Sequence, residues 1–235
     1  ELSSVIVKKN KLLKKELIII KNENGWTIGI TQSVQDFENY AFRDMKRPER
    51  DDRSGMLPPK LAKMMISYDG SDKNKKILDP FCGSGTIVQE ALLLGFKTIY
   101  GADISQKAIN DSQKNINWLK ENRKISANIK LQKIDAKKLG EAFKSESIDL
   151  IISEPFMGDA RFVYLQNNIK NLLSLKSELH DLYFKSFQQF KKILKKNGQI
   201  VFIFPVFNIA NKKLATLNKE LISSIGFALK SDELI

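Results

Sequence analysis

The residue types best suited to chemistry lie in short polar segments that each follow an apolar run. The first segment, residues 79–86, has the sequence Asp-Pro-Phe-Cys-Gly-Ser-Gly-Thr. Gly83 and Gly85 carry no Cβ, so the backbone there can approach a ligand closely. The segment lacks the third glycine of a dinucleotide-binding fingerprint, because Val88 stands at that position, and the Gly-Lys-Ser/Thr of a phosphate-binding loop is absent. A tight strand-to-helix turn without a ligand would account for the same residues.

Two aspartates end the next two apolar runs. Asp103 lies 18 positions after Gly85, where a carboxylate can accept hydrogen bonds from two ribose hydroxyls. Asp135, which precedes Ala136, could accept a hydrogen bond from an adenine amino group. Either aspartate could instead cap the helix that follows it, and Ser105 could also serve as the cap after Asp103.

A fourth segment, Ser153-Glu154-Pro155-Phe156, follows the run Ile-Asp-Leu-Ile-Ile at residues 148–152. Ligands of open α/β sheets bind at the carboxyl ends of the strands. If the four runs are parallel strands, the four segments therefore meet at one edge of a sheet. This convergence is the strongest indication of a site, although the tetrapeptide alone could be an ordinary turn.

The elements that must position these residues alternate along the chain from Lys76 onward. Four to seven mostly apolar residues bounded by turn residues predict each strand, and longer amphipathic stretches predict the helices between them. The expected strands are 77–81, 98–103, 128–134, 148–153 and 199–205, and the expected helices are 86–94, 106–122, 137–143, 177–196 and 212–225. Parallel strands joined by crossover helices give an α/β fold, a doubly wound, Rossmann-like sheet with helices on both faces.

The residues outside this alternation predict an N-terminal extension and an incomplete C-terminal end. Apolar runs on either side of Asn-Glu-Asn-Gly, residues 22–25, predict a β-hairpin within residues 1–34, which we expect to be an extension or the remnant of an RNA-binding domain. Residues 35–235 form the second predicted domain. It includes a helix at 59–68 that begins at two prolines. A closing strand is expected to begin at Phe227, and a hairpin at this sheet edge would need one more strand beyond Ile235.

Composition restricts the classes of function. The 235 residues carry a formal net charge of +12, which favours a polyanionic partner as much as it favours simple solubility. Cys82 and His180 are the single cysteine and histidine, so a disulfide framework and a histidine-rich zinc site are excluded, and we expect no metal. No apolar run approaches the length of a membrane span. A cytoplasmic protein without membrane contact is expected.

Three stretches together resemble a known family. Residues 79–86 resemble motif I of the amino-methyltransferases, and Ser-Glu-Pro-Phe at 153–156 resembles their motif IV. Arg43-Asp44-x-x-Arg47-Pro48-x-Arg50-Asp51, followed by Gly-Met-Leu-Pro-Pro-Lys-Leu-Ala at 55–62, is more specific. It resembles the archaeal-type tRNA guanine-N2-methyltransferases, which modify the guanine at position 10 of tRNA. The resemblance covers residues 40 to 207.

The resemblance implies a class I methyltransferase that binds S-adenosylmethionine and tRNA. The implied cofactor-binding residues are Asp79, Pro80, Phe81, Cys82, Gly83, Gly85, Thr86, Asp103, Ile104, Asp135 and Ala136. In motif IV, the resemblance assigns the acceptors of the guanine amino protons to the Ser153 side chain and the Glu154 carbonyl. Phe156 would stack on the flipped-out base and Pro155 would stiffen the loop.

Two features depart from the family. Glu154 stands where the family usually has the first proline; we expect its carboxylate to accept an amino proton as well. Family members normally carry an N-terminal THUMP domain, and residues 1–30 are too short for a complete one, so that domain is expected to have been cut away or to be absent from this protein.

Several interpretations stay open from the sequence. Arg43, Arg47 and Arg50 could contact RNA phosphates or pair with the neighbouring acidic residues. A DNA adenine-N6 or cytosine-N4 methyltransferase would use the same motifs, and a protein-glutamine methyltransferase would prefer Asn-Pro-Pro-Tyr. A non-catalytic RNA-binding protein that keeps the fold is the alternative from another class.

Overall fold

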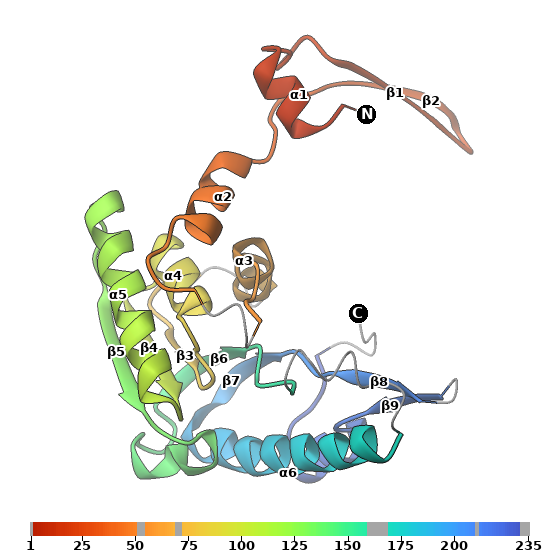
Figure 1. Cartoon of the computed structure of the whole chain (residues 1–235). Coiled ribbons are helices and arrows are strands. Elements are labelled where there is room, and N and C mark those ends of the chain that lie inside the picture. The colour runs from red at the N-terminus through yellow and green to blue at the C-terminus, as the bar shows by residue number, and fades with distance from the viewer. Residues whose placement is uncertain (1, 51–54, 69–71, 159–168, 210–211, 231–235) are drawn as a thin grey trace. The chain divides into compact units, whose positions relative to one another are not determined.

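The computed structural model describes residues 2–50, 55–68, 72–158, 169–209 and 212–230 (Figure 1). The chain divides into two compact units, Glu1–Lys46 and Arg47–Ile235.

The first unit contains the predicted hairpin and two helices that the sequence analysis did not predict. Strands β1 (Leu17–Asn22) and β2 (Gly25–Ile30) pair antiparallel, which confirms the hairpin. Helix α1 (Ser4–Lys9) begins where the Ser3 side chain accepts a hydrogen bond from the Ile6 amide. Helix α2 (Phe37–Met45) begins where the Asp36 carboxylate accepts one from the Asn39 amide. Both helices thus have side-chain caps at their N-termini.

The second unit is built on a five-stranded parallel sheet with the order β5-β4-β3-β6-β7. The strands are β3 (Lys76–Asp79), β4 (Thr98–Asp103), β5 (Asn128–Lys133), β6 (Ile148–Ser153) and β7 (Leu194–Phe202). Strand β3 lies between β4 and β6, so successive connections leave it in opposite directions. This arrangement confirms the doubly wound fold, and it places the topological switch point at β3.

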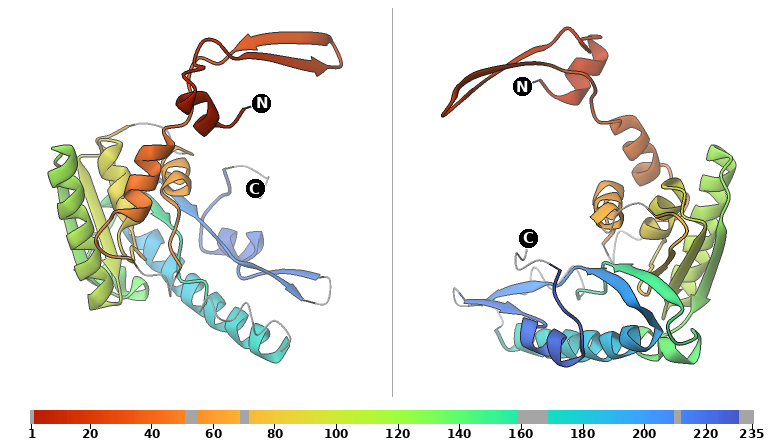
Figure 2. Two further views of the ribbon diagram at one scale, coloured as in Figure 1. Left: turned by 45° about the horizontal axis from the view of Figure 1, so that its top comes forward. Right: turned by 180° about the vertical axis from the view of Figure 1, so that it is seen from behind.

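Helices cover both faces of this sheet (Figures 1 and 2). Alternate strand residues face opposite sides: Ile77 and Leu150 join one core cluster, while Leu78 and Ile151 join the other. The helices and one 3-10 helix are α3 (Pro59–Tyr68), α4 (Thr86–Leu93), α5 (Gln106–Arg123), η1 (Ala136–Glu141), α6 (Ile169–Ile193) and α7 (Lys219–Ser224). Buried aliphatic and aromatic residues of α3, α4 and α5 belong to the first cluster, and those of η1, α6 and α7 belong to the second.

The structure differs from the predicted elements mainly after β6. The helix predicted at 212–225 is wrong in its first part, because Lys212–Ala215 form β9, which pairs antiparallel with β8 (Val206–Ile209). Strand β7 begins earlier than predicted because Leu194 pairs with Ile148 of β6. In both places strand pairing overrides a local sequence that favours helix. The segment at 137–143 forms a 3-10 helix instead of an α-helix, and residues 227–230 contain no strand, while the remainder of that prediction lies outside the described residues.

Among the described residues, no helix is both long enough and apolar enough to cross a membrane.

Candidate active site

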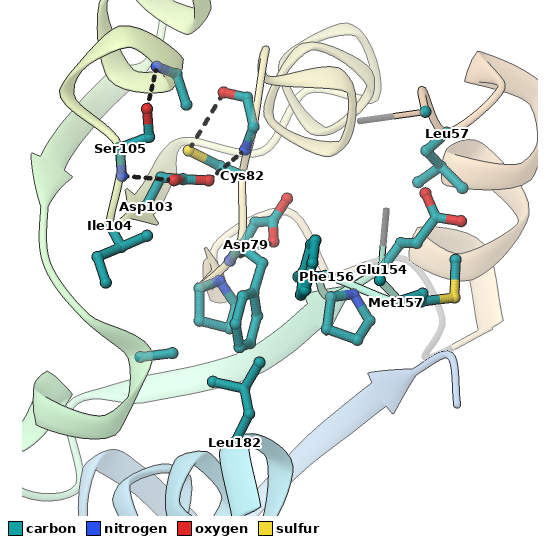
Figure 3. Close-up of a pocket in the computed structure, with 18 of the residues that line it drawn as sticks. Leu57, Asp79, Cys82, Asp103, Ile104, Ser105, Glu154, Phe156, Met157 and Leu182 are labelled. Atoms are coloured by element: carbon teal, nitrogen blue, oxygen red, sulfur yellow. Dashed lines mark hydrogen bonds between the residues drawn. The ribbon is translucent and has the colours of Figure 1, made fainter. Parts of the chain in front are cut away.

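A cavity of about 1070 Å³ lies at the carboxyl edge of the sheet, beside the switch point (Figure 3). It brings together all four polar segments that the sequence analysis singled out. From these segments it is lined by Asp79, Pro80, Phe81, Cys82, Gly83, Ser84, Thr86, Asp103, Ile104, Ser105, Asp135, Ala136, Glu154, Pro155 and Phe156. The volume is at the upper end for small-molecule sites, so it is large enough for a nucleoside cofactor together with a base.

The glycine-containing turn is fastened to the neighbouring strand by backbone hydrogen bonds. The Cys82 amide donates to the Ala102 carbonyl over 2.9 Å, and the Gly83 amide donates to Asp103 Oδ2 over 2.9 Å. Gly83 has a φ of +50°, and no atom lies within 4 Å of the place where a Cβ would stand. The turn therefore exposes bare backbone at the cavity wall, which a ligand can approach.

Gly85 packs closely on the neighbouring helix. It lies outside the cavity lining, and it precedes α4 with a φ of +86°. A methyl group there would lie 2.3 Å from Ser112 Oγ on α5. Gly85 is thus required for close packing of the turn on α5, and its predicted contact with a cofactor stays a prediction.

Asp103 is held in a fixed orientation. Besides the Gly83 amide, the Ser105 amide donates to its carboxylate over 2.8 Å. The cap of α5 is Ser105, whose hydroxyl accepts from the Ala108 amide. Of the two predicted roles for Asp103, the helix cap is therefore taken by its neighbour. The side chain of Ile104 beside it is 66% exposed at the cavity wall, where it offers an apolar surface to a ring.

Asp135 does cap a helix. Its carboxylate accepts from the Lys137 amide over 2.9 Å at the start of η1. It also lines the cavity, so capping and ligand binding are compatible at this position.

Asp79 joins the ends of β3 and β6. Its Oδ1 accepts from Ser153 Oγ over 2.7 Å and from the Phe81 amide over 3.1 Å. Burial raises the pKa of Asp79 to about 7; the nearby carboxylates of Asp103 and Glu154 add to this shift, and the two hydrogen bonds oppose it. Burial also raises the pKa of the Cys82 thiol, which keeps it protonated and unsuited to nucleophilic attack.

The Ser153 side chain is bound to Asp79 and lies outside the cavity lining, and its predicted role as an acceptor stays a prediction. Ser153 is the last residue of β6, is fully buried, and donates its hydroxyl proton to Asp79. Glu154 follows it and lines the cavity, with its carboxylate extending toward Leu57 (Figure 3). Partial burial raises the pKa of Glu154. Because successive side chains of an extended backbone face opposite sides, the Glu154 carboxylate reaches the cavity and the Ser153 hydroxyl does not.

Residues 154–158, which we call the lip, continue the cavity wall. Phe156 is 53% exposed and lines the cavity, and so do Met157 and Gly158. Further lining comes from Leu57 and from apolar residues of α6 and β8, which the sequence analysis did not include: Leu172, Leu175, Leu182, Val206 and Phe207. Their type and spacing are those of ordinary core residues, so the sequence held no sign of their location.

The three arginines predicted to contact RNA have different environments. Arg47 is 3% exposed and donates to Thr86 Oγ1 over 2.7 Å and to Met56 Sδ over 2.9 Å, so its guanidinium is engaged inside the fold and its predicted contact with phosphates stays untested. Arg43 lies over the Tyr40 ring and donates to the Asn39 carbonyl. Arg50 is exposed and stays a candidate for RNA contact.

Asn115 of α5 fastens the segment that follows Arg47 to the glycine-containing turn. Its Oδ1 accepts from the Glu49 amide over 2.9 Å, and its Nδ2 donates to the Glu49 and Ser84 carbonyls over 3.0 and 2.9 Å. Asn115 is fully buried. The sequence analysis missed it because an asparagine in a polar helix has no distinguishing pattern.

Within the part of the chain that the structure describes, no group of three or more His, Cys, Asp or Glu side chains could hold a metal ion.

Comparisons with known proteins give a consistent result. A family model described as UPF0020, RMKL-like, methyltransferase domain matches residues 46–218. A tRNA (guanine(10)-N2)-dimethyltransferase of Pyrococcus abyssi is 26% identical over 194 residues, 82% of this chain and 52% of the relative. Its namesake in Methanocaldococcus jannaschii is 27% identical over 202 residues, 84% of this chain and 52% of the relative. The chain thus spans about half the length of these curated relatives.

The crystal structure of TrmN from Thermus thermophilus is similar in fold, with a TM-score of 0.52 and 21% identity; the match covers 78% of this chain and 47% of that one.

Proposed function

Because the chain belongs to the UPF0020 family of RMKL-like methyltransferase domains, we propose that it transfers a methyl group from S-adenosylmethionine to the N2 amino group of a guanosine in tRNA, at position 10. The names of its relatives support the substrate. The observation that carries the proposal is the shared cavity, in which a fixed Asp103 and the Glu154 carboxylate line one space.

The residues of the glycine-containing turn and the β4 end fit the cofactor. S-adenosylmethionine supplies an electrophilic methyl group on a sulfonium. The open space at Gly83 admits the chain of such a ligand against bare backbone. The oriented carboxylate of Asp103 suits two ribose hydroxyls, and Ile104 offers an apolar surface to the adenine ring. Asp135 and Ala136 lie at the same wall, where the carboxylate can accept from the adenine amino group.

The lip residues fit the methyl acceptor. The guanine amino group is a weak nucleophile because its lone pair is delocalised into the ring. The Glu154 carboxylate accepts one amino proton and the Glu154 backbone carbonyl accepts the other, so the lone pair localises on the nitrogen. Phe156 stacks on the flipped-out base, and Pro155 stiffens the turn between them. The apolar walls from Leu182 and Phe207 exclude water from this half of the cavity.

The tRNA partner is supported by the net charge of +12 and by the exposed Arg50. We place the reaction in the cytoplasm, because tRNA is available there as a substrate.

The decisive experiment incubates the chain with labelled S-adenosylmethionine and bulk tRNA, DNA or protein, followed by mass spectrometry of the digested products. We expect label in N2-methylated guanosine from tRNA. Label in DNA adenine or cytosine, or in protein, would replace the proposal with one of the other methyltransferase classes. Calorimetry that detects no cofactor binding would instead indicate a scaffold that keeps only the fold.

Glu154→Gln tests the acceptor. It removes the negative charge and keeps the shape, so we expect turnover to fall about a hundredfold, as on removing one group that stabilises transition-state charge, with cofactor affinity unchanged. Glu121→Gln is the matched control, because Glu121 is exposed on α5. Wild-type turnover in both variants would exclude Glu154 as the acceptor.

A further inference from the structure

The lip is attached to helix α6 by a partly buried hydrogen bond. The Tyr183 hydroxyl donates to the Phe156 carbonyl over 2.7 Å. Tyr183 is fully buried on α6, and its ring packs edge-to-face against Phe202 at 5.5 Å and Phe204 at 5.9 Å. The ring is therefore held by the core, and its hydroxyl is presented to the lip from a fixed place.

A second contact between the lip and α6 lies two helical turns before Tyr183. Gly158 has a φ of +103°, and a methyl group there would lie 2.8 Å from Leu175 Cδ2. Leu175, Leu179 and Tyr183 are all buried and are spaced four residues apart on α6, so they share one face of the helix. The lip thus contacts this face at Phe156 through a hydrogen bond and at Gly158 through close packing.

These contacts matter because the Phe156 side chain is not held by burial. Phe156 is 53% exposed at the cavity wall, so the direction of its ring depends on the backbone of the lip. A partly buried carbonyl that loses its donor is destabilised until it moves toward another one. The hydroxyl of Tyr183 is therefore placed to fix the position of the Phe156 peptide.

We propose that Tyr183 is a positioning residue for methyl transfer, whose hydroxyl holds the Phe156 carbonyl so that the ring is presented to the acceptor base. The proposal rests on the proposed function. Tyr183 lies outside the cavity lining, and it acts on the base through Phe156 alone.

The kinetic test is Tyr183→Phe, which keeps the packed ring and removes the hydroxyl. We expect kcat to fall about tenfold, the change that corresponds to about 1.4 kcal/mol of transition-state free energy, while cofactor affinity measured by calorimetry stays unchanged. The matched control is Tyr100→Phe, because Tyr100 packs edge-to-face on Phe143 in the same core cluster, away from the lip. An unchanged kcat in Tyr183→Phe, or an equal fall in Tyr100→Phe, overturns the proposal.

A second test needs no activity. Phe156→Trp labelled with 5-fluorotryptophan reports on the lip by fluorine NMR, with the native Trp26 and Trp118 as internal references. Adding Tyr183→Phe should shift or broaden the resonance of residue 156 and leave the two references in place. A residue-156 resonance that does not change overturns the proposal. If the unaltered chain methylates no tRNA, the proposed function fails, and the fluorine result alone decides whether Tyr183 positions the lip.

Discussion

Replacing Asp79 with asparagine should stabilise the protein at neutral and alkaline pH. The folded-state pKa of Asp79 is about 7, against an ordinary value of 3.8, because the carboxyl is buried. Between these two values the folded chain binds a proton that the unfolded chain has released. The free energy of unfolding therefore contains a contribution that is complete below the unfolded pKa and is lost as pH rises through the folded pKa.

The magnitude follows from the shift. About three pKa units at about 1.4 kcal/mol each give about 4 kcal/mol lost above pH 7. The Asp79→Asn variant would escape this loss because an amide does not ionise. The amide oxygen can still accept from the Phe81 amide and the Ser153 hydroxyl, which both reach Oδ1 in Asp79.

The assay is urea denaturation of the cofactor-free chain from about pH 5 to about pH 8.5, with the Asp79→Asn variant beside the parent. The difference in unfolding free energy should grow with pH in favour of the variant and level off above the folded pKa. Asp181→Asn is the control, because Asp181 lies in an exposed ion pair with Lys185 and its difference curve should stay nearly flat. Parallel curves for Asp79→Asn and the parent would show that burial does not raise this pKa.

Three further substitutions test the turn and its supports, each by urea denaturation. Gly85→Ala should cost about 2 kcal/mol more than Gly95→Ala, since both positions have a φ of +86° but only at Gly85 does a methyl group meet Ser112; equal losses would show that Ser112 moves aside without cost. Asn115→Ala should destabilise by about 2–3 kcal/mol and weaken cofactor binding in calorimetry, because the Glu49 and Ser84 groups lose their partner. Arg47→Lys should cost about 2 kcal/mol, because a single ammonium cannot reproduce the two guanidinium contacts; an unchanged stability would argue against a supporting role for Arg47.

Much of the fold was predictable because its elements depend on local patterns. The strands β4 and β6 and the helix α3 have the bounds that the sequence predicted, since apolar runs, caps and prolines act within a few residues. The short elements β8 and β9 were not predictable, because their hydrogen bonds come from each other and the lysine-rich segment at 212–215 gives no local preference for a strand.

The sequence by itself determined which chain segments meet at the site, since the carboxyl ends of parallel strands must share an edge. Only the tertiary structure decided which side chains face the cavity. Ser153 and Glu154 are adjacent, yet one is buried against Asp79 and the other lines the cavity. Arg47 and Arg50 are equally basic, yet Arg47 is buried and donates to Thr86 at the start of α4, whereas Arg50 is exposed. A step of one residue turns a side chain from one face of an extended backbone to the other, and the neighbours it meets there come from distant parts of the chain.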